Sequence, residues 1–272
     1  MLKLSTIHNF LSYLCTHSPL FVGIDRFEQI RVVRKVSTGD TTPKSTRVCS
    51  VTLDAIAESL WNSSDKKGEK YTGTGLKSRM RSILTPWINE MFFSEFVVLV
   101  EGEDDRAALH GAAVYHQKDL ESDGISVIPC GGKNNLGRPI AILQHLGIPF
   151  FVVWDADKET KGARDQDNVR LLRLLKATVT KWPSGVWNSH ACFETNLDMT
   201  IESEIGSKEY ENLIRKFLEV FGFRKKKHAI KNPQFVSDLL SEAGKNGKTS
   251  ATLDSIVLAI YSRFEESSKD SV

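Results

Sequence analysis

The stretch of residues 96–158 constrains the fold most, because short apolar runs alternate in it with helix-like segments. The apolar runs are residues 96–100, 125–128 and 147–154, and the helix-like segments between them are residues 106–117 and a stretch that reaches residue 146. Strand, helix, strand, helix, strand is the order of a parallel α/β sheet. The sequence therefore predicts an α/β fold with a parallel sheet flanked by helices.

Acidic residues follow two of these apolar runs. Glu101 comes directly after residues 96–100, and Asp155 and Asp157 come after the run that ends at residue 154. Ligands of open parallel sheets bind beyond the carboxyl ends of the strands, so these carboxylates are expected to converge. Converging carboxylates repel one another, and a bound divalent cation such as Mg²⁺ offsets this electrostatic repulsion. The alternative is a solvated surface turn, because an isolated Asp-x-Asp is common.

Composition leaves several classes of function open and excludes others. The 272 residues are enough for one large domain or two small ones, and 36 basic against 34 acidic side chains give a formal net charge of +2. The 4 cysteines contain no CxxC pair, so we expect neither a zinc site nor a disulfide framework, in keeping with a reducing cytoplasm. No apolar run approaches the roughly 20 residues of a membrane span. We therefore expect a cytoplasmic protein without a membrane partner.

The chain divides into a small N-terminal part, a main domain and a tail. Residues 63–74 are rich in Ser, Lys and Gly, which is typical of a linker or a mobile loop. We place the division as residues 1–75, 76–265 and a frayed tail of residues 266–272. In the first part we expect strands at residues 10–15 and 29–34, a loop at 37–50 and a helix at 53–61. Beyond them we expect a helical pattern at 76–93 that Pro86 divides, turns at 181–193, and helices at 168–177, 208–222, 235–243 and 252–264.

The whole pattern resembles the Toprim domain, which topoisomerases, primases and certain nucleases share. The matching features are Glu-Gly-x-x-Asp at residues 101–105, Gly-Gly-Lys at 131–133 and Asp-x-Asp at 155–157. Within that group the chain looks like the C-terminal half of the OLD (overcoming lysogenization defect) family nucleases, through Phe-Phe-Ser-Glu at 92–95 and Gly-Ile-Pro at 147–149. The resemblance implies a Rossmann-like Toprim sheet with a helical C-terminal extension. Topoisomerases and primases fit less well, because the chain lacks room for a tyrosine-bearing domain and lacks a zinc site.

The N-terminal part resembles the last part of an ABC-type ATPase head. Thr16-His17-Ser18-Pro19, followed by an apolar pair and the strand-like residues 29–34, matches the region in which a histidine of such ATPases reaches the γ-phosphate. The chain has no G-x-x-x-x-G-K-[ST] loop, and residues 73–78 have the wrong spacing for one. We therefore expect a remnant without a complete ATP site and no ATP hydrolysis by this chain alone. The alternative is an ordinary strand, turn and strand with a structural histidine.

The family resemblance implies a two-metal phosphodiesterase that uses two Mg²⁺ or Mn²⁺ ions. Its catalytic and metal-binding carboxylates would be Glu101, Asp105, Asp155 and Asp157. Its second metal group would be Glu194 and Asp198. At residue 198 this chain has aspartate where the family has glutamate, and the aspartate side chain reaches less far. The alternative is that Asp198 is simply an acid in the first turn of a helix. Lys231, which precedes Asn-Pro, matches a catalytic lysine of the family that offsets negative charge on the phosphate. The alternative is that Lys231 is only one more positive charge in a basic run.

Basic residues suggest a nucleic-acid contact. Lys133 matches the Gly-Lys turn of the family and either holds a loop or touches a phosphate. The dense cluster Arg224, Lys225, Lys226 and Lys227 is a candidate contact to DNA phosphates, or simply a solvated face. We therefore predict a metal-dependent DNA endonuclease or nickase whose partners are DNA and either a separate ABC-type ATPase subunit or a second copy of the chain. The alternative is an inactive or partner-dependent module that binds DNA or that ATPase.

Overall fold

The structure is a computed structural model that describes residues 15–36, 45–80 and 84–269. The strand expected at residues 10–15 lies almost entirely outside the described residues, and so do residues 37–44 of the expected loop. The described chain contains a two-stranded sheet, β1-β2, and a five-stranded sheet in the order β4-β3-β5-β7-β6.

The five-stranded sheet is mostly parallel, as the alternating pattern predicted. Strands β4 (Ile125–Pro129), β3 (Phe96–Val100), β5 (Phe150–Asp155) and β7 (His190–Phe193) run parallel, and β6 (Gly185–Val186) adds an antiparallel edge. Every residue of β3 and β7 is buried, as expected for strands that are covered on both faces. Residues 181–193 were predicted to be turns, so β6 and β7 correct that prediction.

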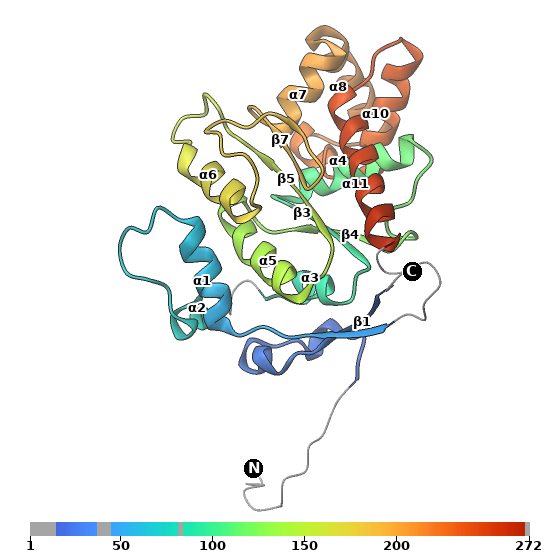
Figure 1. The fold of residues 1–272 in the computed structure, drawn as a ribbon. Helices are drawn as coiled ribbons and strands as arrows, with labels where there is room; N and C mark the ends of the chain where they lie inside the picture. The colour runs from blue at the N-terminus through green and yellow to red at the C-terminus, as the bar shows by residue number, and fades with distance from the viewer. Residues whose placement is uncertain (1–14, 37–44, 81–83, 270–272) are drawn as a thin grey trace, which may run out of the picture.

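Two hydrophobic cores cover the two faces of this sheet. Along β3, Val97 and Leu99 point into the core that contains α5 (Lys133–Leu146), α6 (Asp165–Leu174) and α1 (Leu53–Ser63). The alternate β3 residues Phe96, Val98 and Val100 point into the core that contains α4 (Glu103–Tyr115) and the C-terminal helices. Figure 1 shows α5 and α6 on one side of the sheet and α4, α10 and α11 on the other. The period of two along a strand produces this division.

The C-terminal helices complete one wall of the molecule. They are α7 (Leu197–Ile205), α8 (Ser207–Phe221), α9 (Lys226–Ala229), α10 (Pro233–Lys245) and α11 (Ala251–Lys269). The three predicted helices in this region are confirmed, and Gly222 ends α8 in the left-handed conformation, with φ of 69°. Helix α11 continues past residue 265, where the sequence predicted the start of a frayed tail. None of the helices in the described residues is long and apolar enough to cross a membrane.

The N-terminal part packs on the α5 face of the sheet. Its elements are η1 (Pro19–Phe21), η2 (Ile24–Gln29), β1 (Val32–Val36), β2 (Ser45–Cys49), α1, α2 (Gly73–Met80), α3 (Pro86–Asn89) and η3 (Glu90–Phe92). Phe27 and Ile56 share one core with Leu143 of α5. The prediction of a loop at residues 37–50 was wrong for residues 45–49, which pair as β2 with β1. Pro86 does divide the predicted helix, since it is the first residue of α3.

Candidate functional site

Glu101 and Asp155 lie at the carboxyl ends of the neighbouring strands β3 and β5, as predicted. Glu101 Oε1 accepts a hydrogen bond from the backbone N–H of Asp155 at 2.9 Å, and Oε2 accepts one from the N–H of Lys133 at 3.0 Å. Burial raises the pKa of Glu101, against the opposing effect of the Asp155 N–H and the nearby Lys133 ammonium. The Glu101 carboxylate therefore joins the end of β5 to the first turn of α5.

Asp105 and Asp155 face the same space from two sides. Asp105, in the first turn of α4, accepts a hydrogen bond from the N–H of Gly102 at 2.8 Å, and Asp155 Oδ1 accepts one from the N–H of Leu197 at 3.1 Å. Burial, followed by the negative charge of Glu101, raises the pKa of Asp105 to about 7. Burial, followed by the charges of Asp105 and Glu101, raises the pKa of Asp155 to about 8. The site thus crowds carboxyl groups into a buried space, which favours their protonated forms.

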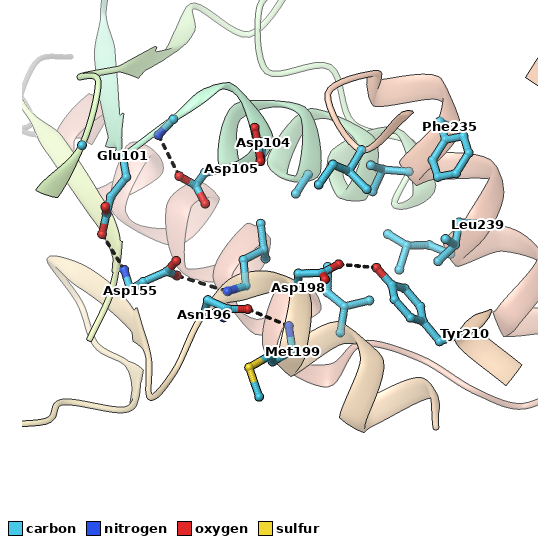
Figure 2. Close-up of a pocket in the computed structure, with 18 of the residues that line it drawn as sticks. Glu101, Asp104, Asp105, Asp155, Asn196, Asp198, Met199, Tyr210, Phe235 and Leu239 are labelled. Atoms are coloured by element: carbon cyan, nitrogen blue, oxygen red, sulfur yellow. Dashed lines mark hydrogen bonds between the residues drawn. The ribbon is translucent and has the colours of Figure 1, made fainter. Parts of the chain in front are cut away.

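These carboxylates line one end of a cavity of about 540 Å³. Figure 2 shows Glu101, Asp105 and Asp155 at that end, Asp198 further in, and Tyr210, Phe235 and Leu239 at the opposite, apolar end. Asp104, which the sequence analysis did not assign to the site, also contributes a carboxylate to the lining. Among the described residues, no lysine, arginine or histidine side chain lines this cavity. Its acidic end is therefore suited to a cation.

The donor chemistry fits a divalent ion such as Mg²⁺ or Mn²⁺, which prefers oxygen ligands. A bound cation would favour the ionised form of Asp105 and Asp155, whose pKa values burial and crowding raise. Within the described ranges, no group of three or more His, Cys, Asp or Glu side chains meets closely enough to hold an ion. In this arrangement the carboxylates of Glu101, Asp105 and Asp155 accept hydrogen bonds from backbone N–H groups.

Asp157 does not line the cavity with the other predicted carboxylates. Its backbone is left-handed, with φ of 60°, and its Oδ2 lies 2.5 Å from Lys133 Nζ. The Lys133 side chain is only 10% exposed. This ion pair connects Lys133 to the turn that carries Asp157.

Asn168 supports the same turn, and the sequence analysis did not single it out. Its side chain is fully buried, and its Oδ1 accepts hydrogen bonds from Trp154 Nε1 at 3.2 Å and from Lys133 Nζ at 3.4 Å. Its Nδ2 donates to the carbonyl oxygens of Ala156 and Lys181, both at 3.0 Å. The one signal in the sequence was an amide at the start of an amphipathic helix, on the face that this helix buries.

The predicted second metal group is divided. Asp198, in the first turn of α7, lines the cavity, but Tyr210 Oη and Lys226 Nζ each lie 2.6 Å from one of its two carboxylate oxygens. Glu194 does not line the cavity; it forms an ion pair with Lys158, and its side chain is 49% exposed. The position of Asp198 in a first helical turn agrees with the alternative that the sequence left open.

The predicted basic residues also lie in different places. Lys231 Nζ is 3.2 Å from Asp104, which lines the cavity, although Lys231 itself does not. In the cluster of residues 224–227, Lys226 is turned toward Asp198, whereas Arg224, Lys225 and Lys227 are exposed. The cluster is therefore not one uniform face. Tyr210 of α8, which the sequence analysis did not assign to the site, also lines the cavity.

Comparisons with known proteins bear on this arrangement. Residues 92–157, which run from before β3 to Asp157, match the family model "Overcoming lysogenization defect protein-like, TOPRIM domain". The resemblance to the Toprim domain of OLD proteins that the motifs carried is confirmed for this stretch. Glu101 after β3, Asp105 of α4 and Asp155 of β5 all fall within this stretch.

Similarity to individual proteins extends beyond those residues. The chain is 30% identical over 164 residues to a protein named "OLD nuclease" from Thermus scotoductus, a match that covers 56% of this chain and 28% of that protein. The C-terminal region of the Burkholderia pseudomallei OLD protein matches 63% of this chain and 99% of that structure, with 21% identity and a TM-score of 0.43. The corresponding region from Xanthomonas campestris pv. campestris matches 64% of this chain and 98% of that structure, with 18% identity and a TM-score of 0.40.

Proposed function

We propose that this chain is a divalent-metal-dependent endonuclease or nickase that hydrolyses phosphodiester bonds of DNA. The observation that carries the proposal is that Glu101, Asp105 and Asp155 line one end of the same cavity, which no cationic side chain of the described residues lines. In open parallel sheets, ligands generally bind just beyond the carboxyl ends of the strands. The name of the Thermus relative, "OLD nuclease", supports this class of reaction. Because this chain matches only 28% of the length of that relative, we carry nuclease activity over to this chain only as a proposal.

The residues would share the work as follows. A DNA phosphate and an acidic cavity repel each other, so a cation must lie between them, and Asp105 and Asp155 are placed to hold it. A bound Mg²⁺ or Mn²⁺ lowers the pKa of water and polarises a phosphoryl oxygen. In the hydrolysis a water oxygen bonds to phosphorus, one bridging P–O bond breaks, and the leaving oxygen takes up a proton.

Surrounding residues would position this site. Glu101, held by the N–H groups of Asp155 and Lys133, keeps the two strand ends in register with α5. With the cation bound, Asp105 would be ionised, and its carboxylate would orient the attacking water and accept the proton that the water releases. Lys231, beside Asp104, would offset charge on the phosphate from the edge of the cavity.

Cleavage of supercoiled plasmid by the purified chain tests the proposal. With Mg²⁺ or Mn²⁺ we expect nicked or linear DNA, and with EDTA we expect none. Asp155→Asn removes a charge from the cavity and should abolish cleavage. Asp165→Asn is the matched control, because Asp165 pairs with Lys181 outside the cavity and should not affect cleavage. Metal-dependent cleavage by folded Asp155→Asn protein would contradict the proposal.

An exposed apolar surface favours a second candidate function, a module that binds a partner protein. Leu20, Phe21, Val33 and Val48 are exposed by 76%, 62%, 62% and 58%, and Val33 and Val48 are paired across the two-stranded sheet β1-β2. Exposed apolar residues on a small sheet are typical of protein contacts. The partner would be a separate ABC-type ATPase subunit or a second copy of the chain. Light scattering on the Val33→Thr/Val48→Thr variant would test it: an unchanged oligomeric state and no loss of ATPase binding count against this candidate.

A further inference from the structure

Both oxygens of Asp198 already have partners within the protein. Tyr210 Oη donates to Oδ1 at 2.6 Å, and Lys226 Nζ donates to Oδ2 at 2.6 Å. The ammonium of Lys226 also lies 4.6 Å from the centre of the Tyr210 ring, within range of a cation–π interaction. Tyr210 is 3% exposed, and burial together with the charge of Asp198 raises the pKa of its hydroxyl, which therefore stays protonated and keeps donating.

We infer that Lys226 supplies, beside Asp198, the positive charge that a second metal ion would otherwise supply, and that the site binds a single divalent ion. This inference rests on the proposed function, since it concerns the same cavity. It replaces the expectation of two ions that followed from the family resemblance.

Charge balance supports one ion. A carboxylate that is paired with an ammonium attracts a further cation less strongly than an unpaired one does. A metal at Asp198 would have to displace Lys226 and then leave the ammonium without a carboxylate partner. Glu194, the other expected ligand, is paired with Lys158 outside the cavity. Neither residue of the expected second group is therefore free in this arrangement. By contrast, no cationic side chain from the described part of the chain lines the cavity beside Asp105 and Asp155.

Lys226 is placed to reach a phosphate as well. The side chain is 34% exposed, and an ammonium has three N–H donors, of which the contact with Asp198 uses one. Asp198 and Tyr210, which line the cavity, would act as positioning residues that hold the ammonium beside it, and Lys226 would touch a phosphate oxygen of the substrate. Asp198 would then serve the reaction without binding metal, which accords with its side chain being shorter than the glutamate expected at that position.

The number of bound ions tests the inference without relying on activity. Titration with Mn²⁺, followed by the electron paramagnetic resonance of the free ion, should give one ion per chain for the wild type and one for Asp198→Asn. Asp155→Asn should bind none. Two ions in the wild type and one in Asp198→Asn would overturn the inference and leave the proposed function standing. No bound ion in the wild type would overturn both.

Cleavage kinetics test the role of Lys226 itself. Lys226→Met should lower kcat on plasmid about 100-fold, the order seen when one group that stabilises developing charge is removed. The affinity for the ion held by Asp105 and Asp155 should stay unchanged, whereas the unpaired Asp198 should attract a further Mn²⁺ more strongly than it does in the wild type. Lys226→Arg keeps the charge and should recover part of the loss. Lys216→Met is the matched control, because Lys216 also makes a short ion pair, at 2.5 Å from Glu242, and lies 5.4 Å from the Phe217 ring, away from the cavity. Wild-type kcat in folded Lys226→Met protein would overturn the assignment.

Discussion

Burial and crowding set the chemistry of single residues in the cavity. The pKa values of Asp105 and Asp155 are raised to about 7 and about 8, first by burial and then by neighbouring carboxylates. In the metal-free protein these groups therefore hold protons that the unfolded chain, with its Asp pKa near 3.8, has released. The native state binds more protons than the unfolded state between these values, so its stability falls as the pH rises.

The metal-free protein should consequently melt at a higher temperature at about pH 5.5 than at about pH 8. Thermal unfolding in EDTA, monitored by circular dichroism, measures this difference. Asp155→Asn removes the titrating group with the higher of the two pKa values, so the melting temperature should depend less on pH. Asp165→Asn should leave the pH dependence of the melting temperature as it is in the wild type. A wild-type melting temperature that rises between these pH values would contradict the assignment of raised pKa values.

Asn168 is the second residue for which the environment makes a strong prediction. Asn168→Ala leaves Trp154 Nε1 and two carbonyl oxygens without their buried partner, and we expect a loss of about 2–4 kcal/mol in the free energy of unfolding. Urea unfolding measures it. Gln166→Ala, at an exposed position of the same helix, should change the free energy by no more than about 0.5 kcal/mol. Equal effects of the two changes would show that the network around Asn168 contributes little.

At the scale of elements, close packing of α4 on α10 shapes the cavity. Helix α4 carries Asp105, and α10 carries Phe235 and Leu239 of the opposite wall. A Cβ atom on Gly111 of α4 would lie 2.7 Å from the carbonyl oxygen of Pro233 and 2.7 Å from Val236 Cβ. Glycine at position 111 therefore permits the distance at which these helices enclose the cavity.

Gly111→Ala should separate α4 from α10 and destabilise the protein by about 1–3 kcal/mol, despite the better helix propensity of alanine. Urea unfolding gives this free energy, and cleavage activity should fall with it because both cavity walls move. Gly137→Ala in α5 is the control, since its Cβ would meet Leu60 Cδ2 at an ordinary 3.5 Å. That change should be neutral or stabilise by up to about 1 kcal/mol. The element-scale argument fails if the two variants unfold alike.

At the scale of the whole molecule, the formal net charge is only +2, so DNA binding would depend on where basic residues lie. The acidic end of the cavity repels phosphates. The exposed residues Arg224, Lys225 and Lys227 lie next to Lys226 in the sequence, and Lys226 is paired with the cavity residue Asp198. In the proposed nuclease, these three side chains would contact the DNA backbone.

Replacing Arg224, Lys225 and Lys227 with glutamine should weaken DNA binding similarly for all sequences. The slope of log affinity against log salt should become shallower by about 2–3, roughly 0.9 for each lost phosphate contact. Fluorescence anisotropy with the uncleaving Asp155→Asn protein measures it. Glutamine at the exposed residues Lys66, Lys67 and Lys70 is the matched control. An identical slope in both triple variants would place the DNA contact elsewhere.

Much of the central fold followed from local patterns in the sequence. The apolar run at residues 96–100 and the alternation after it predicted β3, α4, β4, α5 and β5 because such patterns act within a few residues. The acids that follow β3 and β5 therefore met at the same edge of the sheet. Strands β2 and β7 were missed, because β7 is four residues long, contains His190, and owes its burial to pairing with β5.

The sequence by itself determined the parallel sheet and the meeting of Glu101 with Asp155. Only the tertiary structure decided which carboxylates face the cavity and which are paired. Asp157 contacts Lys133 of the preceding helix, and Asp198 contacts residues 12 and 28 positions further along the chain. The partners of Asp198 lie near it because α8 and α9 pack beside α7. A local pattern carries no information on such distant contacts, and they determine which acids remain free to bind a cation.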